Sequence, residues 1–387
     1  MTGTRTYLDY NASAPLLPEA RQAMLAALDL SANPSSVHSE GRAARKIVER
    51  ARRSVAALAG AQPEHVVFTS GATEAASMLL TPDWRMGRSP LRFSRLYVCA
   101  ADHPCTLSCG RFAPADVDRF GVGADGVVDL PALETLLSAH DRADGLPLVA
   151  IHAANNETGV IQPIRAVAAL VKASGGVLVV DAVQMAGRVV LDITNGYADF
   201  LILSAHKIGG PKGVGALVAR SDLMMPAPLV TGGGQEKGHR AGTENVPGIA
   251  GFGAVADVVA AHLPAIDQVC ALRDRAETAV LAHFPDAVIH GRQAERLANT
   301  TFFTLPGVKA ETAQIAMDLA GIAVSAGSAC SSGRVGPSHV LKAMGFEGDE
   351  GAIRVSIGAD TAIADIERFA AALAGLAGRR NNRSQAA

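Results

Sequence analysis

A lysine and an aspartate each lie at the end of a short apolar run, where both could act on one bound group. Lys207 lies in SAHKIGGPKG, directly after the apolar run ADFLILS, and Asp181 lies near the end of the apolar run GVLVVDA. A carboxylate in such a place is costly to bury unless a cation, a metal or a protonated ring nitrogen accompanies it. A lysine amine can form a Schiff base with a carbonyl compound. The two residue types therefore suit covalent chemistry on an organic cofactor.

Polar residues follow the neighbouring apolar runs as well. Gly71, Ala72 and Thr73 follow HVVFTS and lead into a helix-like segment. Such a junction offers free backbone N–H groups and a hydroxyl to an anion such as phosphate. On its own the junction fits an ordinary helix N-cap equally well, with Glu74 in the first turn. The other polar candidates near the ends of apolar runs are His103, Asn156, Glu157, Gln184, Ser204 and His206.

The combined set predicts a site for pyridoxal phosphate. It supplies an anion-binding junction, an imidazole, an amide, a carboxylate and a lysine. Lys207 would hold the cofactor as a Schiff base, and Asp181 would keep the pyridine nitrogen protonated so that the ring can accept electrons. The glycines after Lys207 would let the backbone approach closely. A lone histidine such as His103 is more often structural, so the prediction depends on the set as a whole.

Alternating strand-like and helix-like segments predict the α/β scaffold that brings these residues together. The apolar runs are rich in β-branched residues and almost continuous, which suits a mostly parallel sheet covered on both faces. In such sheets ligands bind beyond the carboxyl ends of the strands. We predict strands at 65–70, 95–100, 147–153, 176–182, 198–204 and 215–220, and helices at 43–60 and 164–176.

After residue 250 the pattern changes to that of a second, smaller unit. The stretch 248–284 is almost entirely helical in character, and strand-like stretches follow at 299–306, 321–327 and 352–358. This succession predicts an α+β domain. We assign residues 15–262 to the large domain, and residues 1–14 together with 263–387 to the small one.

The composition gives no indication of a nucleic-acid-binding or membrane protein. The chain has 387 residues, of which 49% are hydrophobic and 19% charged, and a net charge of −2. It therefore has material for buried cores but no basic surplus for nucleic acid or anionic lipid. Charged residues and glycines interrupt the apolar stretches, and the N-terminus lacks an apolar signal-peptide core, so we expect a cytoplasmic protein. The five cysteines are thinly spread and predict neither a disulfide framework nor a metal site.

Blocks of residues along nearly the whole chain resemble the cysteine desulfurases of the NifS/IscS type. These are class V aminotransferase-like pyridoxal phosphate enzymes of fold type I. Each block is moderately specific, whereas their joint order is very specific. The resemblance implies a mostly parallel sheet of the seven-stranded type in a large cofactor-binding domain. The blocks are YLDYNASAP (7–15), NPSSVHSEGR (33–42), VVFTSGATE (66–74), NNETGVIQPI (155–164), VDAVQMAG (180–187), SAHKIGGPKGVGAL (204–217), GGGQEKGHRAGTENVPGIAG (232–251), SAGSACSSGRVGPSHVL (325–341) and AIRVSIGA (352–359).

The resemblance assigns a role to each candidate at the strand ends. Lys207 would carry the cofactor, Asp181 would pair with its ring nitrogen, and His103 would stack on the ring and move protons. Thr243 would reach the phosphate in the partner subunit, which implies a homodimer with shared sites. The full set of implied cofactor-binding residues is Ala72, Thr73, His103, Asn156, Asp181, Gln184, Ser204, His206, Lys207 and Thr243.

The resemblance also implies the substrate and the nucleophile. Arg354 would bind the carboxylate of L-cysteine, for which a guanidinium fork is well shaped, and Asn156 would contact the same substrate. Cys330 lies in the Gly/Ser-rich stretch AGSACSSGRVGPSH, where small polar neighbours favour an exposed thiol over a buried one. It would attack the substrate sulfur, leaving a persulfide on the enzyme and releasing L-alanine. A sulfur-acceptor protein, serving iron–sulfur cluster assembly or another sulfur-using pathway, would then take the sulfur.

Three alternatives remain open at this stage. A selenocysteine lyase could use the same scaffold and the same residues. A class V aminotransferase could too, although it has no need of a thiol such as Cys330. A catalytically silent sulfur-transfer partner is the third, but retention of Lys207, Asp181 and His103 argues against it.

Overall fold

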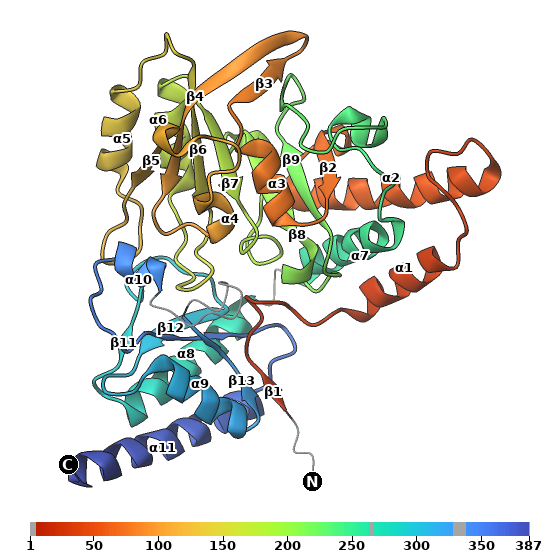
Figure 1. The fold of residues 1–387 in the computed structure, drawn as a ribbon. Coiled ribbons are helices and arrows are strands. Elements are labelled where there is room, and N and C mark those ends of the chain that lie inside the picture. The colour runs from red at the N-terminus through yellow and green to blue at the C-terminus, as the bar shows by residue number, and fades with distance from the viewer. Residues whose placement is uncertain (1–4, 263–265, 328–337, 387) are drawn as a thin grey trace.

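The computed structural model describes residues 5–262, 266–327 and 338–386. A large sheet flanked by helices occupies one part of the molecule, and a smaller sheet with its own helices occupies the other (Figure 1). The first described residues and the last described helix, residues 363–386, both lie on the side of the smaller sheet. The predicted fold class, a large α/β part with a smaller α+β part, is confirmed. The boundaries at residues 14 and 262 stay a prediction.

The large sheet contains nine strands in the spatial order β10-β3-β4-β6-β7-β8-β9-β2, with β5 paired to β4. Every strand predicted for this part is present, and the short strands β3, β5 and β10 are added toward one edge. The strands are β2 (Val66–Thr69), β3 (Asp83–Met86), β4 (Ser89–Cys99), β5 (Val117–Phe120), β6 (Leu146–His152), β7 (Val177–Asp181), β8 (Phe200–Ser204), β9 (Gly215–Ala219) and β10 (Met224–Pro226).

The directions of the strands bring the candidate residues to one edge of the sheet. Strands β4, β6, β7 and β8 are parallel to one another. Strand β9 is antiparallel to β8, and β2 is antiparallel to β9, so β2 points the same way as β8. The carboxyl ends of β2, β4, β6, β7 and β8 therefore meet at the same edge, where ligands of α/β sheets bind.

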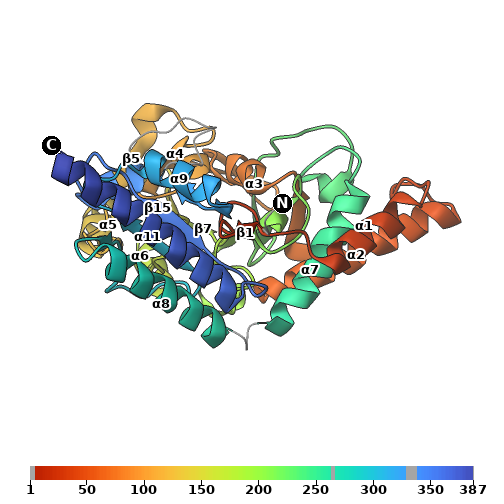
Figure 2. The same ribbon diagram turned by 90° about the horizontal axis from the view of Figure 1, so that it is seen from below.

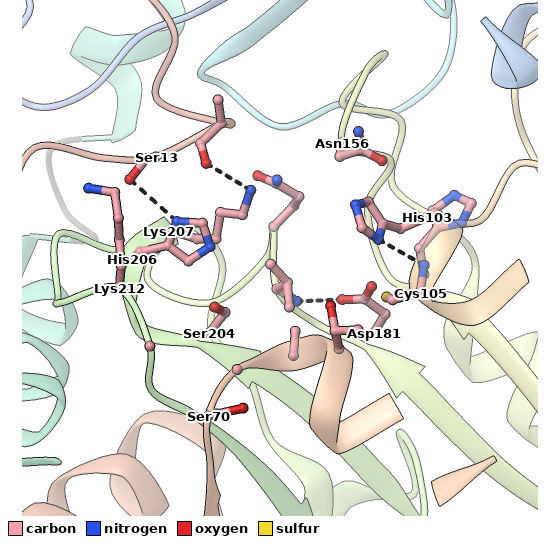
Figure 3. Close-up of a pocket in the computed structure, with 18 of the residues that line it drawn as sticks. Ser13, Ser70, His103, Cys105, Asn156, Asp181, Ser204, His206, Lys207 and Lys212 are labelled. Atoms are coloured by element: carbon pink, nitrogen blue, oxygen red, sulfur yellow. Dashed lines mark hydrogen bonds between the residues drawn. The ribbon is translucent and has the colours of Figure 1, made fainter. Parts of the chain in front are cut away.

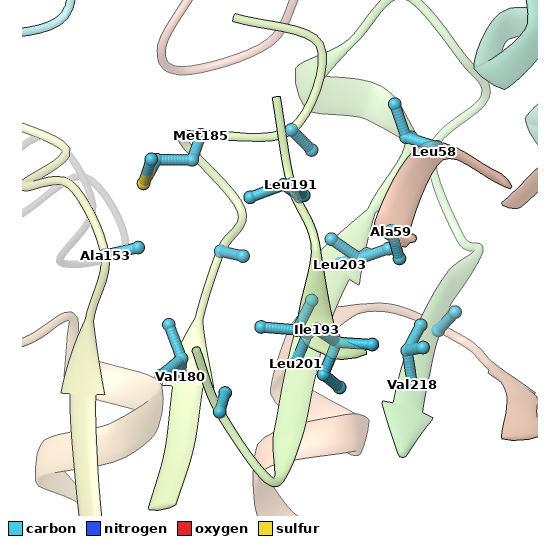
Figure 4. Packing of buried hydrophobic residues seen from close by; sticks show 14 of the residues in the cluster. Leu58, Ala59, Ala153, Val180, Met185, Leu191, Ile193, Leu201, Leu203 and Val218 are labelled. Atoms are coloured by element: carbon cyan, nitrogen blue, oxygen red, sulfur yellow. The ribbon is translucent and has the colours of Figure 1, made fainter. Parts of the chain in front are cut away.

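Both faces of the central strands are buried, which explains their continuous apolar runs. Successive side chains point to opposite faces, so Leu201 and Leu203 of β8 pack in one core while Phe200 and Ile202 pack in the other. Figure 4 shows part of the first core, where Leu201 and Leu203 of β8 lie between Val180 of β7 and Val218 of β9.

Two groups of helices cover these two cores. Residues of α2, α5, α6 and α7 contribute to the first core, and residues of α3 and α4 contribute to the second. Helix α1 packs with α2 and α7 at the side of the molecule (Figure 2). The helices are α1 (Pro18–Leu28), α2 (Ser39–Ala59), α3 (Ala72–Leu79), α4 (Pro104–Leu107), α5 (Leu130–Ser138), α6 (Ile164–Ala173) and α7 (Val246–His262), with short 3-10 turns η1 (Pro63–His65), η2 (Pro114–Asp116), η3 (Ile193–Asn195), η4 (Ala205–Lys207) and η5 (Gln235–Gly238).

The smaller part has a core of its own and includes the start of the chain. Its four-stranded sheet has the order β11-β12-β15-β14, and β1 near the N-terminus pairs in parallel with β13. Helices α8 and α11 lie side by side against this sheet (Figure 2). Leu8 joins the same hydrophobic core as Phe303 and Phe369. The elements are β1 (Thr6–Tyr7), β11 (Val288–Ile289), β12 (Thr300–Thr304), β13 (Ile322–Ala323), β14 (Ser325–Ala326), β15 (Ile353–Ser356), α8 (Ile266–His283), α9 (Ala310–Leu319), α10 (His339–Ala343) and α11 (Ile363–Ala386).

Within the described ranges, no single helix has both the length and the apolar character needed to cross a membrane. Only α7 and α8 taken together, as a strongly bent pair, reach those limits by length and composition.

Candidate active site

A cavity of about 450 Å³ lies at the carboxyl ends of the central strands (Figure 3). Its size is within the range of small-molecule and cofactor sites. Nine of the residues predicted to bind the cofactor line this cavity. They are Ala72, Thr73, His103, Asn156, Asp181, Gln184, Ser204, His206 and Lys207.

Lys207 reaches the cavity from the 3-10 turn η4, which directly follows β8. Its Nζ donates hydrogen bonds to the carbonyl oxygens of Asn11 at 2.7 Å and Ala12 at 3.0 Å. The glycines behind it serve close packing, because a Cβ on Gly209 would lie 2.7 Å from Cγ of Leu17, and its φ of +89° favours glycine. The segment that follows β1 thus closes over the strand ends and positions the lysine amine.

Asp181 ends β7, and its carboxylate is largely withdrawn from water. The residue is 8% exposed, and its Oδ1 accepts a hydrogen bond of 3.0 Å from the Val183 N–H. Burial raises the pKa of Asp181 to about 6, and the nearby Asp102 carboxylate adds to this increase. A cationic ring nitrogen in the cavity would remove this penalty, because opposite charge favours the ionised form.

His103 is held in its neutral form beside the cavity. It is the N-cap residue of α4, and its Nδ1 accepts a hydrogen bond of 3.2 Å from the Cys105 N–H. Burial, followed by the charges of Lys207 and His339, lowers the pKa of His103 to about 4. The neutral ring therefore carries its proton on Nε2, and its apolar face can lie against an aromatic cofactor.

The start of α3 forms an open cradle suited to an anion. The first N–H groups of a helix have no partner within the helix. A Cβ built on Gly71 would meet no atom within 4 Å, so the space in front of these groups is clear. On the other side, a Cβ on Gly215 would lie 2.7 Å from Cα of Gly71, so β9 needs a glycine there. Together with Thr73 and Ser204, this donor set fits a phosphate group.

Two predicted residues lie beside the cavity rather than in its lining. Arg354, on β15, is fully buried and donates to Oδ1 of Asp9 at 2.7 Å and to the carbonyl oxygen of Asn156 at 3.0 Å. Thr243 is exposed and lines a neighbouring cavity that shares Ser70 and Gly213 with the first. Their roles toward substrate and partner subunit stay predictions.

The predicted nucleophile, Cys330, lies outside the described residues. Ser338 and His339, the first described residues after it, form hydrogen bonds with residues that follow strands of the large sheet. Ser338 Oγ donates to the Glu157 carboxylate at 2.5 Å, and His339 Nε2 lies 2.8 Å from the carbonyl oxygen of Asp102. Ser338 and His339 are therefore held beside the residues that adjoin Asn156 and His103.

Sequence reasoning missed four polar side chains that line the cavity: Ser13, Ser70, His152 and Lys212. Ser13 Oγ lies 3.3 Å from Nδ1 of His206, and no local pattern links positions so far apart in sequence. Lys212 belongs to the quoted stretch SAHKIGGPKG, so its charge beside an anion site could have been noticed. His152 lies inside the apolar run 147–153, whose pattern predicts a strand and gives no sign of a polar site.

The pKa values predict how the stability of the cofactor-free protein depends on pH. Burial lowers the pKa of His103, His206 and His290 from 6.5 to about 4. The unfolded chain binds these protons first, so the free energy of unfolding falls as pH drops from 6.5 to 4. Asp181, with a pKa raised from 3.8 to about 6, has the opposite sign, because its folded form binds a proton first. Asp181→Asn should therefore lose stability more steeply over this range than wild type.

Urea unfolding of the cofactor-free protein at several pH values between 7 and 4 measures this difference. Asp144→Asn, which removes an exposed carboxylate, is the matched control and should follow the wild-type curve. Parallel curves for wild type and Asp181→Asn would contradict the assignment of a raised pKa to Asp181.

Comparisons with known proteins agree with the fold and identify the family. The class-V aminotransferase family profile matches residues 6–369. The chain is 40% identical to a cysteine desulfurase of Cereibacter sphaeroides over 375 residues, which is 94% of either chain. It is 35% identical to a cysteine desulfurase of Klebsiella pneumoniae, covering 95% of this chain and 92% of that one. A solved NifS-like protein from Rickettsia africae superposes with a TM-score of 0.87 at 32% identity, over 96% of this chain and 99% of that one.

The chain belongs to the class-V aminotransferase family and, within that family, to the cysteine desulfurases. The predicted resemblance is thereby confirmed over almost the whole length. A further solved structure, described as SspA in complex with cysteine, superposes with a TM-score of 0.74 at 28% identity, over 91% of this chain and 98% of that one.

Proposed function

We propose that this enzyme binds pyridoxal 5′-phosphate in the cavity at the strand ends and converts L-cysteine to L-alanine, leaving the sulfur as a persulfide on Cys330. The observation that carries the proposal is the meeting of Lys207 and Asp181 in one cavity that also opens onto the start of α3. An amine, a buried carboxylate and an anion cradle match the aldehyde, the ring nitrogen and the phosphate of this cofactor. The names of the curated relatives support the activity.

Different residues of the chain would bind the phosphate, the ring nitrogen and the ring face of the cofactor. The first-turn N–H groups of α3, with Thr73 and Ser204, would hold the phosphate. The Asp181 carboxylate would accept a hydrogen bond from the protonated ring nitrogen, and neutral His103 would lie against the ring. When bound, pyridoxal phosphate supplies an electron sink for the charge released as a proton leaves the substrate α-carbon.

Lys207 and His103 would move protons in the reaction. The Lys207 amine is aimed at the cavity through its contacts with Asn11 and Ala12. It would bind the cofactor and, once displaced by the substrate amine, take the proton from the substrate α-carbon.

Arg354 would bind the substrate carboxylate. In the described part of the chain its buried Nε has no hydrogen-bond partner, so one donor remains for this contact.

The sulfur step can be written with a complete atom balance. The Cys330 thiolate attacks Sγ of the substrate, an S–S bond forms, and the Sγ–Cβ bond breaks with its electron pair left on carbon. A proton added to that carbon and the return of the α-proton from Lys207 to the α-carbon complete L-alanine, and the enzyme keeps the persulfide. No external oxidant or reductant is needed for this step. A sulfur-acceptor protein would then remove the terminal sulfur, in iron–sulfur cluster assembly or another sulfur-using pathway.

The proposal includes a cytoplasmic homodimer. Thr243 is exposed and lies by a second cavity adjoining the first, which is where a residue offered to a partner subunit's phosphate would be found. The part of the chain that precedes Thr243 is held by Glu236. Its buried carboxylate accepts hydrogen bonds from Arg52 at 2.7 and 2.9 Å and from the Phe68 N–H at 2.9 Å.

A product assay tests the activity directly. The purified enzyme, supplied with pyridoxal phosphate, L-cysteine and a reducing thiol, should form alanine and sulfide in equal amounts. Selenocysteine and a 2-oxo acid acceptor are offered in parallel. Rapid turnover of selenocysteine alone would indicate a selenocysteine lyase, and amino transfer without sulfide would indicate an aminotransferase. Failure to take up pyridoxal phosphate would overturn the proposed site.

A further inference from the structure

Two buried polar residues lie directly behind Asp181. His152 ends β6 and is the register partner of Asp181 on the neighbouring strand β7. Asp102 follows β4, the strand on the other side of β6. Asp102 is 1% exposed and His152 is 4% exposed, so both residues are almost completely shielded from solvent. Buried polar groups of this kind need hydrogen-bond partners.

The hydrogen bonds around His152 determine where its proton lies. The side-chain oxygen of Gln162 accepts from the Val128 N–H at 2.9 Å, so its NH₂ group is the donor. This NH₂ group donates to the carbonyl oxygen of Gly126 at 2.9 Å and lies 3.1 Å from Nε2 of His152. Nε2 must therefore be the acceptor, and the proton of the neutral imidazole is on Nδ1.

The Nδ1 proton points at Asp102. Oδ1 of Asp102 lies 2.5 Å from Nδ1 of His152 and also accepts the backbone N–H of His152 at 2.8 Å. Over the described part of the chain, Oδ2 of Asp102 is buried without a hydrogen-bond partner. Asp102 is thus a fixed carboxylate whose orientation is set through His152 and Gln162, and its charge is poorly screened.

A metal ion is a competing explanation for these residues. Ligand atoms of Cys99, Asp102 and His152 all lie within 4.8 Å of one another. However, both nitrogens of His152 are already used in hydrogen bonds, one as donor and one as acceptor. Burial also raises the pKa of the Cys99 thiol well above its usual value, which keeps it protonated. These observations favour a hydrogen-bonded dyad over a metal site.

We propose that Asp102 and His152 form a positioning dyad that holds negative charge behind Asp181 and thereby strengthens its hydrogen bond to the protonated ring nitrogen of the cofactor. The inference rests on the proposed function, because it concerns the same cofactor. An anion fixed behind the Asp181 carboxylate makes the local potential more negative, so a proton shared between that carboxylate and a ring nitrogen is held more tightly. Neither dyad residue needs to touch the reacting atoms.

The electrostatics of the cavity are consistent with this role. Burial is the largest cause of the raised pKa of Asp181, and the Val183 N–H lowers that pKa; of the charged groups, Asp102 raises it, and His152 and Lys207 lower it. Burial, and after it the Asp181 carboxylate, raises the pKa of the Cys105 thiol. Lys207 is committed to the carbonyl oxygens of Asn11 and Ala12 as well. Among the described residues, Asp102 is therefore the negatively charged group that acts on Asp181 from behind the cavity, and its removal should weaken the hydrogen bond between Asp181 and the ring nitrogen.

A binding experiment with two cofactors isolates this effect. Dissociation constants are measured by fluorescence titration of the cofactor-free protein with pyridoxal phosphate and with its 1-deaza analogue, which has carbon in place of the ring nitrogen. Asp102→Asn should bind pyridoxal phosphate about tenfold more weakly, as expected for a supporting hydrogen-bond partner, and the deaza analogue within twofold of wild type. A purely structural role would weaken both ligands alike, and that result would overturn the proposal.

A second variant and a second readout guard against misfolding. Gln162→Met removes the donor to Nε2 while keeping the dyad, and it should show a smaller, same-direction loss for pyridoxal phosphate. Nitrogen-15 NMR of wild-type, cofactor-free protein should show His152 protonated on Nδ1 alone. His290→Gln, at a buried histidine directly after β11, is the matched control and should leave both dissociation constants unchanged.

The outcomes separate this inference from the proposed function. If wild type binds pyridoxal phosphate and Asp102→Asn binds it equally well, only the dyad proposal fails. A proton on Nε2 of His152, or a metal ion found in the purified protein at this position, would also overturn it. If wild type takes up no pyridoxal phosphate at all, the proposed function fails and the dyad proposal fails with it.

Discussion

Replacing Lys207 with alanine should lower the formation of alanine and sulfide from L-cysteine by on the order of a thousandfold or more. The amine is proposed both to bind the cofactor and to move the α-proton, so its loss removes two functions at once. The change should leave the fold intact, because Lys207 lies in the short turn η4 and its side chain points into the cavity rather than into a hydrophobic core. Product formation and the absorbance spectrum of the purified protein measure the effect.

Lys212→Ala is the informative comparison for this variant. Lys212 lines the same cavity, but it is exposed and follows the glycine-rich turn instead of ending the strand. We expect it to weaken cofactor binding modestly, through the lost positive charge near the phosphate, while the protein stays coloured and active. An equal loss in both variants, or a larger loss in Lys212→Ala, would show that the wrong amine was assigned.

The sequence predicted the strand ends well because they depend on local physics. A strand buried on both faces must be apolar at nearly every position, so a polar residue such as Asp181 or Lys207 marks the point where the strand leaves the core. The order and direction of the strands are not encoded in this way. That β2 and β9 run antiparallel to each other depends on which strands pair, and the edge strands β3 and β10 are short and partly exposed.

The parts of the site that were missed depend on contacts between distant residues. The carbonyl oxygen of Asn11 accepts a hydrogen bond from Lys207, which lies 196 positions later in the sequence. The residues around Asn11 show no local pattern that predicts a segment packed over the strand ends. His152 was hidden for a related reason. A single histidine within an apolar run is compatible with an ordinary strand, and only the fold brings it to Asp102, 50 positions earlier.

Replacing Cys330 with serine should abolish sulfur transfer while leaving the cofactor site intact. We expect at least about a thousandfold less alanine and sulfide from L-cysteine, because a serine hydroxyl is a far weaker nucleophile toward sulfur than a thiolate. Binding of L-cysteine should persist, since Lys207, Asp181 and His103 are untouched. The two effects are measured separately, by product assay and by the change in absorbance when L-cysteine is added.

The combination of results is what identifies Cys330 as the sulfur acceptor. Cys270→Ser is the matched control, because Cys270 is a partly exposed thiol on α8 that contacts Arg273 and lies outside the cavity lining. It should keep wild-type activity. If Cys330→Ser loses both the products and the spectral change, the cysteine supports cofactor or substrate binding instead. If it keeps full product formation, the sulfur leaves the substrate without an enzyme persulfide, and a lyase-type route replaces the proposed one.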